Sequence, residues 1–94
     1  VTLMSDWFCV SAWYENGETE VHYEIANEDG EQYFFWLNIN LINEKLSRKD
    51  GSALDKFFYA EEDMLALAVT ILDEEMVEDV EHIEISTRLF NRYF

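Results

Sequence analysis

The 94-residue chain has no proline, three glycines and one cysteine. It shows no linker, repeat or low-complexity tract, so we expect residues 1–94 to form a single domain. One cysteine excludes an internal disulfide and gives no sign of a secreted disulfide scaffold. No apolar run reaches the roughly 18 residues that a membrane-spanning helix needs. The first residues lack the basic and apolar regions of a signal peptide, so we expect a cytoplasmic location.

Basic residues are scarce as well. Six Lys and Arg stand against 21 Asp and Glu, which gives a formal charge of −15 and a pI near 4.1. The first base is Lys45, and none lies between Lys56 and Arg88. Nucleic acids and anionic membranes are bound through basic surfaces. We therefore expect the chain to bind neither directly.

Motifs for catalysis or metal binding are also lacking. With three glycines and two histidines, no Gly-rich phosphate loop or Ser-His-Asp arrangement is readable. His82 with Glu78, and His22 with Glu24, come nearest to a metal or deaminase-type site. No zinc or EF-hand spacing accompanies them, and the Cys-x-x-Cys half of a deaminase site is missing. Cys9 has no cationic neighbour to activate it. We expect no cofactor or metal, and no enzyme.

Large apolar residues are what the chain has in abundance: 49% of residues are hydrophobic and 16% aromatic. The run from Trp7 to Tyr14 is followed by Asn16-Gly17, a strong hairpin signal because both turn positions need positive φ. A two-residue loop would pair Tyr14 with Thr19. The same register gives the pairs Ala12–Val21, Val10–Tyr23 and Phe8–Ile25 on a mostly apolar face. It puts Cys9, Ser11 and Trp13 on the other face, opposite Glu24, His22 and Glu20.

The second turn, residues 27–30, allows two registers. A two-residue Asp-Gly loop would put Trp36 and Asn38 on the apolar face. A three-residue loop with a left-handed Gly30 would instead put there Tyr33, Phe35, Leu37 and Ile39. Since a slip of one residue moves every side chain to the opposite face, only one register can be right. We predict the three-residue loop, because it keeps the asparagines out of the core.

From Ser52 onward the apolar residues recur at helical spacing. The acids at 61–63 suit a helix N-terminus, so the main helix is predicted at about 60–77, and short helices can form at 41–46 and 54–59. Residues 80–89 return to alternation and predict a closing strand. Its inward residues would be Ile83, Ile85, Thr87 and Leu89, and its outward residues His82, Glu84, Ser86 and Arg88. The predicted fold is α+β: a three-stranded antiparallel meander, a closing C-terminal strand, and the main helix on one sheet face.

This register leaves aromatic residues on the outer face of the sheet. Trp13, Phe34 and Trp36 would lie there beside Glu20, His22, Glu24 and Asn38. Contiguous exposed apolar patches are scarce on monomers. The face is therefore either a second core layer, covered by a helix or by Phe90, Tyr93 and Phe94, or an interface whose aromatic residues supply affinity.

The acidic run at 73–84 is the second candidate surface. Such a run is most often a solvated helix end, yet no base balances this one, and an acidic surface complements the basic clefts of proteins that act on nucleic acid. The predicted partner-binding residues are Trp13, Glu20, His22, Glu24, Trp36, Asp73, Glu74, Glu75, Glu78 and Asp79.

The favoured hypothesis is a stoichiometric inhibitor: a bacterial immunity protein or antitoxin that blocks a basic nuclease toxin. One alternative is a phage-encoded anti-CRISPR or anti-restriction protein that imitates the charge of DNA and binds a CRISPR or restriction effector. A second alternative is a homo-oligomeric adaptor or structural domain, such as a homodimer, that buries the Trp face against itself.

Overall fold

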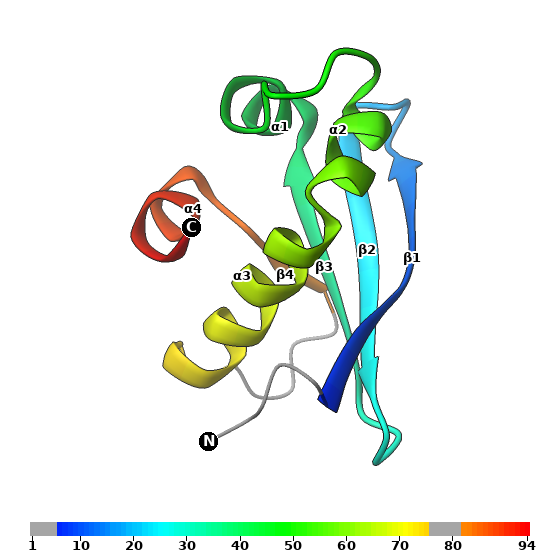
Figure 1. Cartoon of the computed structure of the whole chain (residues 1–94), viewed down its shortest axis with the longest axis vertical. Helices are drawn as coiled ribbons and strands as arrows, with labels where there is room; N and C mark the ends of the chain where they lie inside the picture. Colours follow the sequence, from blue (N-terminus) through cyan, green and yellow to red (C-terminus); the bar gives the residue numbers. More distant parts are fainter. Residues whose placement is uncertain (1–5, 76–81) are drawn as a thin grey trace.

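The computed structural model describes residues 6–75 and 82–94, which form a four-stranded sheet and four helices. In chain order these are β1 (Trp7–Glu15), β2 (Glu20–Asn27), β3 (Gln32–Asn38), α1 (Ile39–Lys45), α2 (Ala53–Tyr59), α3 (Glu61–Glu74), β4 (His82–Glu84) and α4 (Thr87–Tyr93). The sheet order is β1-β2-β3-β4, with the first three strands antiparallel and β4 parallel to β3. The helices lie on one side of the sheet (Figure 1). The predicted α+β class and meander are confirmed.

A single core fills the space between the sheet and the helices. Tyr23, Phe35, Phe57 and Met64 are fully buried in it. The ring of Tyr23 packs 4.8 Å from that of Phe57, and its hydroxyl donates to the carbonyl oxygen of Met64 at 3.0 Å. Burial raises the pKa of Tyr23. Each such side chain contributes about 1.5–3 kcal/mol on burial, and the Tyr23 hydroxyl costs little because it has a partner.

The second turn has the predicted register. Tyr23 pairs with Phe35 and Val21 with Leu37, and all four are fully buried. Gly30 has a φ of 86°, in the left-handed region that glycine adopts without strain. The three-residue alternative is thereby confirmed, and the face of every β3 side chain follows from it.

The predicted two-residue loop between β1 and β2 is wrong. The connection spans residues 16–19, and the first three of them have φ values of 53°, 66° and 64°. As a result Tyr14 pairs with Val21 instead of Thr19. Because the loop takes up two more residues than predicted, the register shifts by two positions. Side chains near the turn therefore keep their predicted face.

Farther from the turn, β1 contains a bulge that reverses the prediction. The register shifts after Cys9 and leaves Val10 as an extra residue. Cys9, predicted to face outward, pairs with Ile25 and packs against the core, and Trp7 is only 7% exposed. Phe8 and Val10, predicted inward, are 50% and 48% exposed. One inserted residue moves every side chain beyond it to the opposite face, and here it buries Trp7.

The two short helices are confirmed within two residues of their predicted bounds, as α1 and α2. Ile39, predicted to face inward from a strand, instead begins α1 after Asn38 as N-cap. The main helix is α3, which ends at Glu74 with Glu75 as its C-cap, before the predicted position 77. No described helix is long and apolar enough to cross a membrane.

The predicted strand over 80–89 is mostly wrong. Residues 80 and 81 lie outside the described part of the chain, and β4 ends at Glu84. Ser86, predicted to point outward in a strand, is the N-cap of α4 and accepts a hydrogen bond from the amide of Leu89 at 3.3 Å. Thr87, predicted inward, is exposed. A helix forms here instead of a strand because it packs three apolar residues against the core from one face: Leu89, Phe90 and Tyr93.

Candidate interface on the outer face of the sheet

The outer face is the side of the sheet that points away from the helices. Cross-strand pairs define it, because directly paired residues share a face. Trp13 pairs with His22, His22 with Trp36, and Trp36 with Glu84. A second row runs parallel to the first, through Ser11, Glu24, Phe34 and His82.

Aromatic rings make contact across all four strands. His22 stacks on Trp36 with ring centroids 5.9 Å apart and planes 14° apart. Trp13 lies 6.3 Å from His22 and 6.4 Å from Phe34. His82 of β4 completes the cluster, 5.2 Å from Phe34 and 5.9 Å from His22. We call these five residues the aromatic cluster.

Carboxylates fix the cluster from its edge. The indole nitrogen of Trp13 donates to Glu15 at 2.8 Å. Nε2 of His22 lies 2.9 Å from Oε1 of Glu20, and the Asn16 amide donates to the other oxygen at 3.2 Å. The hydrogen bond from His22 is the main cause that lowers the pKa of Glu20. These hydrogen bonds to Glu15 and Glu20 therefore fix the rings of Trp13 and His22 in the free protein.

The charge of the outer face has one sign. None of the four described strands contains a Lys or Arg. Four glutamates lie on the outer face: Glu15, Glu20, Glu24 and Glu84. Apolar rings surrounded by carboxylates form a surface that fits a basic partner better than an acidic one.

The alternative of a second core layer is not supported by the described residues. Phe90 is 2% exposed in the main core, Tyr93 packs against that core, and Phe94 stacks on Phe90 at 4.4 Å. Neither tryptophan of the aromatic cluster packs against the core. Both remain partly exposed to solvent.

No protein-family model matches the chain, and no curated protein or solved structure matches it either. The function must therefore be argued from the geometry. Within residues 6–75 and 82–94, no group of three or more His, Cys, Asp or Glu is placed to hold a metal ion. Burial, followed by the nearby carboxylates of Glu61 and Glu24, raises the pKa of Cys9 to about 11. Its thiol is a poor nucleophile for that reason.

The structure brings together half of the predicted partner-binding residues. Trp13, Glu20, His22, Glu24 and Trp36 all lie on the outer face. The predicted residues at the end of α3 do not join them, because that helix packs on the core side of the sheet (Figure 1). Residues 78 and 79, also predicted, lie outside the described part of the chain.

The acids at the end of α3 have different surroundings from one another. Asp73 and Glu74 are exposed. Glu75 is partly buried and joins α3 to α4: it accepts hydrogen bonds from Tyr93 at 2.5 Å and from Arg88 at 3.3 Å. The expectation that no base balances this run is therefore wrong at Glu75.

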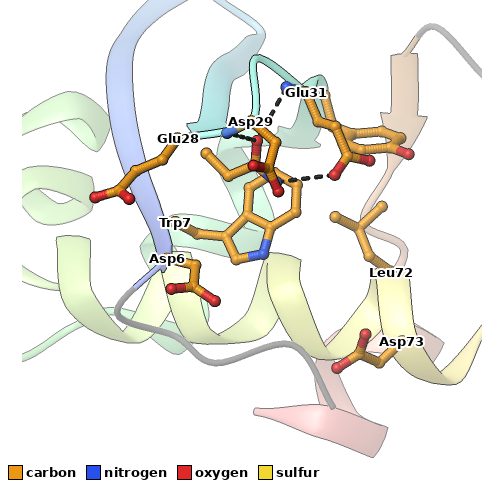
Figure 2. A pocket seen from close by; sticks show the side chains of 9 residues that line it. Asp6, Trp7, Glu28, Asp29, Glu31, Leu72 and Asp73 are labelled. Atoms are coloured by element: carbon orange, nitrogen blue, oxygen red, sulfur yellow. Dashed lines mark hydrogen bonds between the residues drawn. The ribbon is translucent and has the colours of Figure 1, made fainter.

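Sequence reasoning missed two features. It placed His82 and Glu84 outward but did not foresee that β4 would add His82 to the aromatic cluster and pair Glu84 with Trp36. It also missed an acidic hollow lined by Asp6, Trp7 and the turn after β2 (Figure 2). The only available signal for the hollow was the acidic turn itself, since its other walls come from distant parts of the chain.

Proposed function

We propose that this domain acts by binding, as a small acidic inhibitor that occupies the nucleic-acid cleft of a basic protein. A bacterial immunity protein or antitoxin that blocks a nuclease toxin is the best fit. The observation that supports the proposal most strongly is the outer face, where fixed aromatic rings stand among carboxylates. Inhibition of this kind needs no catalytic residue.

Charge supplies the first part of the mechanism. A formal charge of −15 on a small domain attracts a basic cleft over a long range and speeds association. The same charge repels nucleic acid. Inhibitor and substrate therefore compete for the same cleft.

The aromatic cluster supplies the second part. Tryptophan is enriched among residues that dominate binding energy, particularly when water is excluded around it. Trp13 is held by Glu15, and Trp36 is held by its stack on His22. Rings that are already fixed lose little conformational entropy on binding. We expect them to slow dissociation of the complex.

A phage-encoded anti-CRISPR or anti-restriction protein would use the same surface. It too needs acids that imitate the charge of DNA on a stable scaffold. The neighbourhood of the gene separates the two: an adjacent toxin gene favours the immunity protein, and a phage operon favours the phage inhibitor.

Self-association is a second candidate, and one observation favours it. Phe8 is 50% exposed on β1, an edge strand, and exposed edges invite pairing with another copy. A homodimer that buried the outer face would, however, bring two sets of four glutamates together. Their repulsion makes this arrangement less favourable than a basic partner.

Capture from a lysate of the host strain, followed by an activity assay, tests the inhibitor function. We expect the immobilised domain to retain a basic protein that cleaves or binds nucleic acid. That activity should fall to zero at one equivalent of added domain. Retention of an acidic protein, or of the domain alone, would contradict the proposal.

Rate measurements on the captured partner test the interface. Trp36→Ala should raise the dissociation rate about 30-fold or more, the effect of losing a residue worth ~2 kcal/mol. Phe58→Ala is the matched control, because Phe58 is 49% exposed on α2, away from the outer face. If Phe58→Ala had the larger effect, the interface would lie on the helix side.

Two matched charge variants complete the test. Glu24→Gln with Glu84→Gln should lower the association rate, and raising the salt concentration should reduce the difference from the unmodified domain. Asp73→Asn with Glu74→Gln removes the same charge from the end of α3 and should change the rate less. The opposite order would place the partner at α3.

A further inference from the structure

A second surface feature lies at the end of the molecule opposite α1 and α2. It is a hollow of about 400 Å³ between the start of β1, the turn from β2 to β3 and the end of α3 (Figure 2). Pockets for small ligands and side chains begin near this size, at roughly 300 Å³. Its lining residues are Asp6, Trp7, Asn27, Glu28, Asp29, Glu31, Tyr33, Leu72 and Asp73.

Acids surround the hollow. The five carboxylates are those of Asp6, Glu28, Asp29, Glu31 and Asp73. None of them belongs to an ion pair within the described part of the chain. Five negative charges around one space repel each other, and a cation among them would relieve that repulsion.

The hollow also contains a buried donor without a partner among the described residues. Trp7 is 7% exposed, and its indole nitrogen makes no hydrogen bond to the described residues. Figure 2 shows this nitrogen on the edge of the ring that faces Asp6 and Leu72, away from the turn. A buried N–H without an acceptor is unfavourable, and most such groups in proteins are satisfied. The nitrogen has almost no exposed surface, so a ligand carbonyl would satisfy it after a small movement of the side chains around it.

The turn that carries three of the acids is held in a fixed shape. The side-chain oxygen of Asn27 accepts hydrogen bonds from the amides of Asp29 at 3.1 Å and Glu31 at 3.0 Å. Its side-chain nitrogen donates to the Glu31 carboxylate at 3.0 Å. The ring of Trp7 packs 5.9 Å from that of Tyr33. The acids and the indole therefore share one ordered wall.

We propose that this hollow is a subsite for an arginine side chain of a bound polypeptide. The guanidinium lies among the carboxylates, and a neighbouring peptide carbonyl accepts the hydrogen bond from Trp7. A guanidinium has five donors in one plane, so it satisfies several carboxylates at once, whereas lysine offers a compact point charge. A metal ion would not use the indole N–H, and a polyamine has no carbonyl to accept it.

This subsite is independent of the proposed inhibitor function. The hollow lies on the helix side of the sheet, and none of its lining residues belongs to the aromatic cluster. Any polypeptide that presents an exposed arginine satisfies the chemistry. Its test therefore uses a defined small probe and needs no captured partner.

NMR of the indole N–H groups provides the test. The chain has three tryptophans, and Trp7→Phe assigns the Trp7 signal. If that variant does not fold, Trp13→Phe and Trp36→Phe assign it by elimination. The probe is N-acetyl-arginine methylamide, added at constant ionic strength. We expect a saturable downfield shift of the Trp7 indole proton, with the other two signals unchanged.

Three control probes separate the parts of the recognition. Ethylguanidinium has the cation without a carbonyl, so it should compete with the arginine probe without the downfield shift. The corresponding lysine derivative should bind more weakly, and the norleucine derivative should not bind. A norleucine derivative that shifted Trp7 as strongly as the arginine probe would overturn the proposal.

A pair of double variants tests whether the hollow itself is responsible. Asp6→Asn with Asp73→Asn should weaken binding of the arginine probe about tenfold or more, because these two side chains flank the indole nitrogen in Figure 2 and each charge-assisted hydrogen bond becomes a weaker neutral one. Glu24→Gln with Glu84→Gln removes the same charge from the outer face and should leave the affinity nearly unchanged. Equal losses in both variants, or no saturable shift of Trp7, would contradict the subsite.

Discussion

Leu37 and Trp36 are neighbours in β3 whose side chains lie on opposite faces of the sheet. Leu37 is fully buried against the helices, whereas Trp36 is partly exposed on the outer face. We expect Leu37→Ala to lower the free energy of unfolding by about 2–5 kcal/mol, as for other buried leucines. Trp36→Ala should cost less, because part of its surface is already in water. Urea denaturation of both variants measures the difference, and the reverse order would contradict this register.

Side-chain faces were predictable from the sequence wherever strict alternation held. The polar residues of β2 and the asparagine at the end of β3 were enough to place His22 and Trp36 outward. Near the start of β1 the alternation gave the wrong face, because nothing local marks Val10 as the inserted residue. Whether Trp7 or Phe8 enters the core depends on the space that α3 leaves, which is a tertiary effect.

A capping box at the start of α2 allows a prediction at the level of a single helix. Ser52 accepts a hydrogen bond from the amide of Asp55 at 3.1 Å, and the Asp55 carboxylate accepts one from the amide of Ser52 at 3.1 Å. Ser52→Ala should cost about 0.5–2 kcal/mol of stability. Ser47→Ala, at an exposed position between α1 and α2, should stay within about 0.5 kcal/mol. Thermal unfolding compares the two; equal losses would exclude a capping role.

The contact between α3 and α4 predicts a dependence on pH. Hydrogen bonds from Tyr93 and then Arg88 lower the pKa of Glu75 below its ordinary value of 4.5. A carboxylate with a lowered folded pKa stabilises the fold above the unfolded pKa, and this contribution is lost as the pH falls through the folded pKa. Glu75→Gln should therefore lower the melting temperature at pH 7.

The difference in melting temperature between Glu75→Gln and the unmodified domain should shrink once the pH falls below about 4.5. Asp73→Asn is the matched control, because it removes the same charge from an exposed position on the same helix. It should not lower the melting temperature at pH 7, since it reduces repulsion. A Glu75→Gln deficit that stayed constant from pH 7 to pH 3 would argue against this linkage.

The sequence predicted α1, α2 and α3, whereas it predicted part of a strand in place of α4. The fourteen residues of α3 cover several turns, so their period was clear. The seven residues of α4 begin inside a stretch whose alternation also fits a strand. Ser86 followed by apolar residues three, four and seven positions later was the available sign of a helix. Packing of Phe90 in the core decided between the two readings.

At the scale of the molecule, three bases gather near α1 and α2, whereas acids lie at both ends. Lys45, Arg48 and Lys56 line one hollow there together with Asp63. Asp73 lines the acidic hollow at the other end, and the outer face adds four glutamates. The sequence showed the clustering of bases but not which acids meet, because that depends on the sheet face against which the helices pack. The proposed partner surface was therefore predictable for the strands and not for α3.

The excess of acids predicts that salt stabilises the fold. The molecule is 34 Å long, and the screening length is about 30 Å at 0.01 M salt but about 8 Å at 0.15 M. At low salt most of the 21 carboxylates repel one another, and at moderate salt only close neighbours do. Raising NaCl between these concentrations should raise the melting temperature.

KCl should have the same effect, because screening depends on ionic strength alone. Asp73→Asn with Glu74→Gln should respond less steeply than the unmodified domain. A flat curve, or different curves for the two salts, would mean that a bound cation rather than screening compensates the acids.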